Sequence, residues 1–183
     1  MVVSPFVPLT TLAAALLAGT GFVAFRLPNS PQDGVAAEVG LRGVTQVRVL
    51  QTRQWEDRAV ALYRGRDGTQ NELGVAFLSR SFTHWAGETA NDVITSGPLP
   101  GPVEISCGSG RGPTFQYTAV YGRALSPAVA SVSASVRGKT HHATFGADHG
   151  FLLAIPQAIE VRNLVVRDRL GRVLWHASRS CSS

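Results

Sequence analysis

The sequence predicts a mainly β protein, in which an N-terminal transmembrane helix precedes an antiparallel meander and an immunoglobulin-like β-sandwich half. Three observations predict this class. Phe6–Phe25 contains no charged residue. Apolar and polar residues alternate with a period of two from Gln46 onward, and turn residues recur at the spacing of about 8–12 residues that is typical of sandwiches. With 44% apolar and 16% charged residues, the chain does not have the composition of a disordered protein.

The N-terminal run is long enough to cross a membrane. Its twenty residues, at about 1.5 Å each, make a helix of roughly 30 Å, the thickness of the hydrocarbon core. Its content of Ala, Gly and Thr also fits a cleaved signal peptide. Phe25 and Arg26 follow closely on the permissive cleavage region Leu17–Thr20, which favours an uncleaved anchor over residues 1–26.

The flanking charges bear on the orientation of this anchor. Arg26 and Arg42 lie on its C-terminal side, and the positive-inside rule taken alone would leave the following domain in the cytoplasm. Asp33 and Glu38 share that flank and weaken the rule. We therefore expect a single-pass protein of the cell membrane with an extracytoplasmic domain.

Residues 27–43 are expected to link the anchor to this domain. Leu27–Gly34 is rich in residues that interrupt regular structure. Val35–Leu41 is expected to form a short helix, with Asp33 as its cap and Gly43 as its stop.

Residues 44–183 are predicted to form the β-rich soluble domain, beginning with a meander over residues 44–96. Within Asp57–Arg64, alternate residues are expected on opposite faces: Ala59, Ala61 and Tyr63 on one, Val60 and Leu62 on the other. The expected strands are Gln46–Trp55, Asp57–Arg64, Glu72–Ser81 and a short one after a turn at Ala86–Gly87.

Gly97–Pro102 is the strongest break in the domain, and Val103–Cys107 after it is expected to be a short strand. Gly108–Pro113 is predicted to be a loop. Its three glycines invite comparison with a phosphate-binding loop, but a β-type run follows where that site requires a helix.

The sandwich half is predicted over residues 114–178, from short strands separated by turns. The expected strands are Tyr117–Arg123, Val129–Val136, His141–Phe145, Phe151–Ile155 and the hairpin of Val161–Val166 with Val173–His176.

Positive charge is concentrated in this half. Residues 27–110 hold seven Arg against nine Asp or Glu, whereas residues 111–183 hold eight Arg and one Lys against three carboxylates. A basic half can bind an anionic surface such as lipid headgroups or an envelope polymer, and the alternative is a solvated surface without a ligand. Few aromatic residues lie among the cations, so nucleic-acid binding is not expected. The candidate binding residues are Arg123, Arg137, Lys139, Arg162, Arg167, Arg169 and Arg172.

The chain has two cysteines, Cys107 and Cys181. Outside the cytoplasm an isolated pair is often a disulfide, which would fix the C-terminus to the middle of the chain. Two unrelated thiols are the alternative.

No catalytic, cofactor or metal site is predicted. His141 and His142 are neighbours on an expected strand and therefore face opposite ways, which does not suit a shared metal. An enzyme, such as a hydrolase with a cleft between the two halves around His84, Glu88 and Asp92, is kept as the alternative.

The motifs AVALYRGRDG, LGVAFLSRS, VYGRALSPAVASVSASVRGK and VVRDRLGRVL resemble those of a group of uncharacterised bacterial single-anchor extracytoplasmic proteins, mostly from Gram-positive species. The similarity covers roughly residues 45–175. Tyr121, Gly122, Pro127 and Gly171 match as turn and strand-start residues. The resemblance implies a membrane-tethered β domain and supplies no activity.

The sequence thus favours a non-enzymatic, membrane-anchored envelope module that binds a protein or an anionic partner. A structural subunit of a larger assembly is a further alternative.

Overall fold

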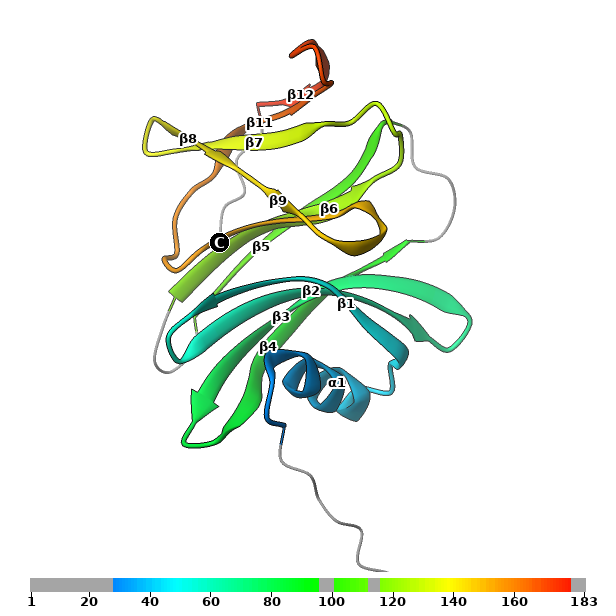
Figure 1. The fold of residues 1–183 in the computed structure, drawn as a ribbon, viewed down its shortest axis with the longest axis vertical. Coiled ribbons are helices and arrows are strands. Elements are labelled where there is room, and N and C mark those ends of the chain that lie inside the picture. Colours follow the sequence, from blue (N-terminus) through cyan, green and yellow to red (C-terminus); the bar gives the residue numbers. More distant parts are fainter. Residues whose placement is uncertain (1–27, 96–100, 112–115, 179–183) are drawn as a thin grey trace, which may run out of the picture.

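The computed structural model describes residues 28–95, 101–111 and 116–178, which form four stacked layers (Figure 1). Helix α1 (Pro31–Leu41) covers sheet A, sheet A faces sheet B, and sheet B faces sheet C. The predicted mainly β class is confirmed. The expected anchor Phe6–Phe25 lies outside the described residues, and among those described no helix has the length and apolarity needed to span a bilayer.

Helix α1 begins earlier than the sequence predicted. Ser30 is its N-cap: the Ser30 hydroxyl accepts from the Asp33 N–H, and the Asp33 carboxylate accepts from the Ser30 N–H, each at 3.2 Å. This reciprocal pair is a capping box, and Pro31 at the first helical position is preorganised for it. Asp33 is thus inside the first turn, and the expected linker ends at Ser30. The helix ends before Gly43, whose φ of +88° suits glycine.

Sheet A is an antiparallel meander in which each strand pairs with the next in sequence. The alternation predicted for its second strand is observed. Ala59, Ala61 and Tyr63 pack under α1, and Val60 and Leu62 face sheet B. The strands are β1 (Thr45–Trp55), β2 (Arg58–Asp67), β3 (Gln70–Ser81) and β4 (His84–Thr95).

The last strand of sheet A corrects the sequence prediction. The turn expected at Ala86–Gly87 is absent, because β4 runs through these residues and the chain reverses at Phe82 and Thr83 instead. A register shift opposite Phe77 and Leu78 absorbs the extra residue Glu88 as a β-bulge. Gly87 therefore lies next to a bulge within a strand and not in a turn.

Sheets B and C complete the stack. Sheet B has the order β5-β6-β10-β9, and sheet C has the order β12-β11-β7-β8. A 3-10 turn, η1 (Ala147–His149), connects β9 to β10. The strands are β5 (Val103–Arg111), β6 (Gln116–Ala124), β7 (Ser131–Val136), β8 (Lys139–His142), β9 (Thr144–Phe145), β10 (Gly150–Ile155), β11 (Arg162–Arg167) and β12 (Val173–Ala177).

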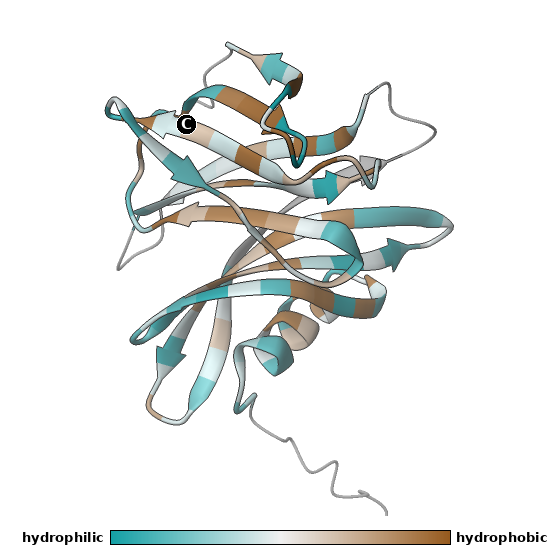
Figure 2. Cartoon of the chain, turned by 45° about the horizontal axis from the view of Figure 1, so that its top comes forward, coloured by the Kyte–Doolittle hydropathy of each residue, from teal (hydrophilic) through white to brown (hydrophobic). Residues whose placement is uncertain are grey.

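Sheet B is buried on both faces. On β6, Tyr117, Ala119 and Tyr121 pack against sheet A, while Val120 packs against sheet C. Apolar residues, drawn brown, lie mainly along the interior strands (Figure 2). The expected meander forms sheet A by itself, and sheet B packs between it and sheet C.

Two predicted boundaries are wrong for local reasons. Gly108, Ser109 and Gly110 continue β5 where a loop was expected. A Cβ at Gly110 would lie 1.8 Å from the Tyr117 Oη, so this glycine leaves room for the neighbouring ring. The expected strand His141–Phe145 is divided, because the chain passes from sheet C to sheet B at Ala143.

Candidate functional site

A cleft of about 660 Å³ lies between sheets A and B. In the middle of this interface apolar side chains pack together, but toward one end the same strand faces carry arginine. Arg64 and Arg66 follow Val60 and Leu62 at alternate positions along β2. Guanidinium groups retain their charge and are rarely buried without a partner. The apolar rows therefore end in a polar cleft.

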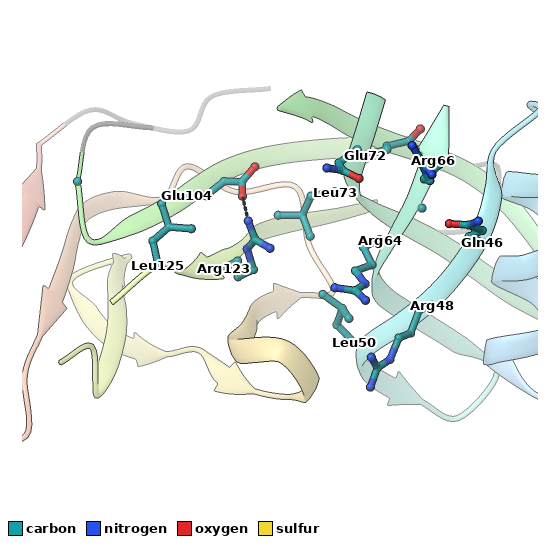
Figure 3. Close-up of a pocket in the computed structure, with 13 residues that line it drawn as sticks. Gln46, Arg48, Leu50, Arg64, Arg66, Glu72, Leu73, Glu104, Arg123 and Leu125 are labelled. Carbon is teal, nitrogen blue, oxygen red and sulfur yellow. Dashed lines mark ion pairs between the residues drawn. The ribbon is translucent and has the colours of Figure 1, made fainter. Parts of the chain in front are cut away.

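Four arginines and two glutamates give the cleft its chemistry (Figure 3). Sheet A supplies three of the arginines, and sheet B supplies the fourth. The lining is Gln46, Arg48, Leu50, Arg64, Gly65, Arg66, Asn71, Glu72, Leu73, Gly101, Glu104, Arg123 and Leu125.

Both glutamates are buried and hydrogen-bonded or ion-paired, as a buried carboxylate requires. Glu104 on β5 lies opposite Arg123 on β6, with 3.6 Å between Oε2 and Nη2. Glu72 accepts a hydrogen bond from the hydroxyl of Tyr63. Figure 3 shows the Glu104–Arg123 pair at one end of the cleft and Glu72 beside Arg66 at the other.

Two of the arginines share one carboxylate. Asp148 Oδ2 lies 3.2 Å from Arg48 Nη1 and 3.0 Å from Arg64 Nη1. Asp148 is in η1 with a φ of +51°, a conformation that aspartate adopts more readily than most residues. The side chains of Arg48 and Arg64 are 55% and 46% exposed. Each guanidinium has five N–H donors, so one shared carboxylate leaves donors facing the cleft.

Arg66 is the third cation on this wall. It is exposed, and among the described residues no carboxylate lies within ion-pair distance of its guanidinium. The wall formed by Arg48, Arg64 and Arg66 therefore carries more positive charge than its carboxylate neutralises. We call these three residues the arginine wall.

The seven binding residues expected from the sequence do not form one surface. Arg123 lines the cleft and faces Glu104. Arg137, Lys139 and Arg162 lie at one end of sheet C, where Arg162 pairs with Ser135 in register and Lys139 with Val136. Arg167, Arg169 and Arg172 lie at the opposite end, in and beside the turn between β11 and β12.

Several of these cations have local partners. Arg162 is 2.5 Å from Glu160, and the hydrogen bond and charge of Glu160 raise the pKa of Arg162. Arg167 Nη1 donates to the Gly171 carbonyl at 2.7 Å. Glu160 thus offsets the charge of Arg162, whereas the bond to Gly171 engages one donor of Arg167 within the β11–β12 hairpin.

Asp168 organises the β11–β12 turn. Its carboxylate accepts from Arg172 Nε at 2.6 Å and from the backbone N–H groups of Leu170 and Arg172 at 2.9 Å. Burial opposes its ionisation, but these hydrogen bonds and the Arg172 charge outweigh burial and hold the pKa of Asp168 below its ordinary value. Arg172, a predicted ligand-binding residue, is thus engaged in the turn.

Sequence reasoning missed the arginine wall. Its three residues belong to the half of the chain in which acidic residues outnumber basic ones. The net charge therefore indicated residues 111–183 as the binding region instead. The available signal was the alternation along β2, in which two arginines continue a buried apolar row. That signal becomes informative only when a second sheet is known to face the row.

Two of the three residues in the alternative catalytic set, His84 and Glu88, do not line this cleft. A cleft between the two parts of the chain does exist, but His84 and Glu88 lie on β4 and are absent from its lining. The side chain of Asp92 falls outside the described part of the structure. Within that part, no group of three His, Cys, Asp or Glu residues is placed to hold a metal ion.

The predicted disulfide stays a prediction. Cys107 lies exposed on β5, whereas Cys181 is outside the described residues.

Comparison with known proteins adds no assignment: no family model, curated protein or solved structure matches this chain.

Proposed function

We propose that this chain is a non-enzymatic module, tethered to the cell membrane by Phe6–Phe25, that binds an anionic partner in the cleft between sheets A and B. The observation that carries the proposal is the arginine wall, in which Arg48 and Arg64 share the carboxylate of Asp148 and Arg66 has no acidic partner among the described residues. Guanidinium groups bind carboxylate and phosphate through paired N–H donors. The ligand is a partner that presents such groups.

The proposal also includes the orientation of the domain, the disulfide and the immunoglobulin-like half. Anchored by Phe6–Phe25, the domain faces the extracytoplasmic side, where a Cys107–Cys181 disulfide is favoured by the oxidising environment. The face-to-face packing of sheets B and C supports an immunoglobulin-like half over residues 114–178.

Binding of labelled polyglutamate and of polyphosphate to the detergent-solubilised full chain tests the anion site, and the two probes separate carboxylate from phosphate. We expect binding of at least one probe that weakens as ionic strength rises. The double variant Arg64→Gln, Arg66→Gln is expected to lower the affinity about tenfold or more, because charge-assisted hydrogen bonds are lost.

The matched control removes the same charge from sheet C. Arg137→Gln, Arg169→Gln changes two exposed cations outside the cleft, and it should leave the affinity nearly unchanged. An equal loss in both double variants would assign binding to the general surface charge. Failure of the unmodified chain to bind either probe would contradict the proposal.

A structural subunit is the second candidate, and one surface favours it. Leu170, Val173 and Leu174 are 78%, 52% and 36% exposed on the β11–β12 hairpin, and β12 is an edge strand of sheet C. Exposed apolar residues on an edge strand suit a protein partner that extends the sheet. Loss of a co-purifying partner in Val173→Lys, with retention in Arg66→Gln, would favour this candidate.

A further inference from the structure

The tip of the β3–β4 hairpin carries an aromatic side chain that the fold does not use. Phe82 is 95% exposed, so it contributes almost nothing to a core. Its φ is +52°, a region that is unfavourable for a bulky residue and natural for glycine. An exposed phenylalanine in a conformation suited to glycine suggests a role outside the folded domain.

This hairpin lies where the chain enters the domain. The Trp85 N–H donates to the Pro28 carbonyl at 2.8 Å, and Trp85 is buried with Val35 and Val39 of α1. The first described residues are therefore fixed beside β4, three residues from Phe82. Figure 1 shows the first described residues, in blue, and the β3–β4 hairpin at the same end of the molecule, beside α1.

The distance to the proposed anchor is short. Pro28 follows Phe25 by three residues, and an extended chain advances at most about 3.6 Å per residue. Pro28 therefore lies within roughly 11 Å of the end of the anchor segment. With Phe6–Phe25 in the bilayer, this end of sheet A is held close to the lipid surface.

We propose that Phe82 inserts into the interfacial region of the bilayer and forms a second membrane contact beside the anchor; this inference rests on the proposed anchor. Aromatic and other apolar side chains on a surface element enter the headgroup and acyl boundary. Arg80, exposed on β3 two positions before Phe82, is placed to meet lipid phosphates. The contact would fix the tilt of the domain on the membrane.

Tryptophan fluorescence tests this contact in the full chain reconstituted into vesicles with lipids brominated near the headgroup. Phe82→Trp reports from the hairpin tip. Thr69→Trp is the matched control, because Thr69 is an exposed turn residue at the other end of β3. The unmodified chain, with its three tryptophans, supplies the background, and circular dichroism checks that each variant is folded.

We expect bromine to quench the added emission of Phe82→Trp about threefold more than that of Thr69→Trp, as an interfacial side chain requires. Equal quenching in a chain that resists carbonate extraction would overturn the contact and leave the anchor intact. Release of the chain by carbonate would overturn the anchor, and the contact with it.

Discussion

Arg123 and Glu104 face each other across β6 and β5, and the pair is asymmetric: the glutamate side chain is 6% exposed and the arginine 42%. The buried carboxylate of Glu104 therefore relies on Arg123 to offset its charge, whereas the arginine can also be solvated by water. We expect Arg123→Gln to lower the free energy of unfolding by about 1–3 kcal/mol, because a buried carboxylate loses a charged partner. Urea unfolding measures this change.

The double variant Arg123→Gln, Glu104→Gln is the informative control for that prediction. Removing both charges should recover part of the loss, since no unpaired charge remains buried. Strictly additive losses would show that the pair is not coupled.

Phe82→Gly should stabilise the protein. The left-handed backbone at Phe82 penalises a side chain, and relief of this penalty is expected to raise the free energy of unfolding by about 1 kcal/mol. Thermal unfolding in detergent measures it. Thr83→Gly is the comparison, because Thr83 has no positive φ and glycine there should destabilise. If Phe82→Gly raises the free energy of unfolding and also weakens the proposed membrane contact, Phe82 is retained for that contact and not for the stability of the fold.

Gly74→Ala and Gly40→Ala should change stability in opposite directions. A Cβ at Gly74 would lie 2.5 Å from the Tyr63 Oη, inside the core under α1. We expect a loss of at least about 2 kcal/mol from overpacking. Gly40 is exposed in α1 with open space around it, so alanine should add about 0.5–1 kcal/mol of helix stability. Chemical denaturation of both variants provides the test.

Asp168 should make stability depend on pH in the acid range. Its pKa is lowered below the ordinary value of 3.8 in the folded protein, so the unfolded chain takes up this proton at a higher pH than the folded one. The stabilisation is present above that value and is lost as pH falls through it toward the folded pKa. Urea unfolding of the unmodified chain and Asp168→Asn should differ most near neutral pH and converge in acid.

Local patterns predicted the strands better than the connections between them. Alternation along β2 gave both faces of that strand correctly, because burial of one face against α1 and of the other against sheet B imposes a period of two. The β3–β4 turn was misplaced, because Phe82 occupies a glycine-like conformation that no turn rule predicts. Ser30 was overlooked as the helix cap, although Ser30, Pro31 and Asp33 are a recognisable start signal.

The candidate site could not be predicted because it depends on contacts between distant segments. Arg64 and Asp148 meet only when η1 packs against β1, and the spacing of the two residues in the sequence does not predict that contact. The sequence indicates Arg123 through its charge, but it does not indicate the buried partner Glu104. Charge counts locate cations along the chain, whereas a site is defined by which of them the sheets bring together.

Sheet B contributes β6 and β10 to the cores on both of its sides. Neither part of the chain can therefore be expressed alone without exposing the apolar face that its neighbour covers. A fragment ending near residue 100 would present Val60, Leu62, Val75 and Phe77 to water, and such a fragment should aggregate. The domain should accordingly melt as one cooperative unit, and a truncated chain should be degraded by quality-control proteases.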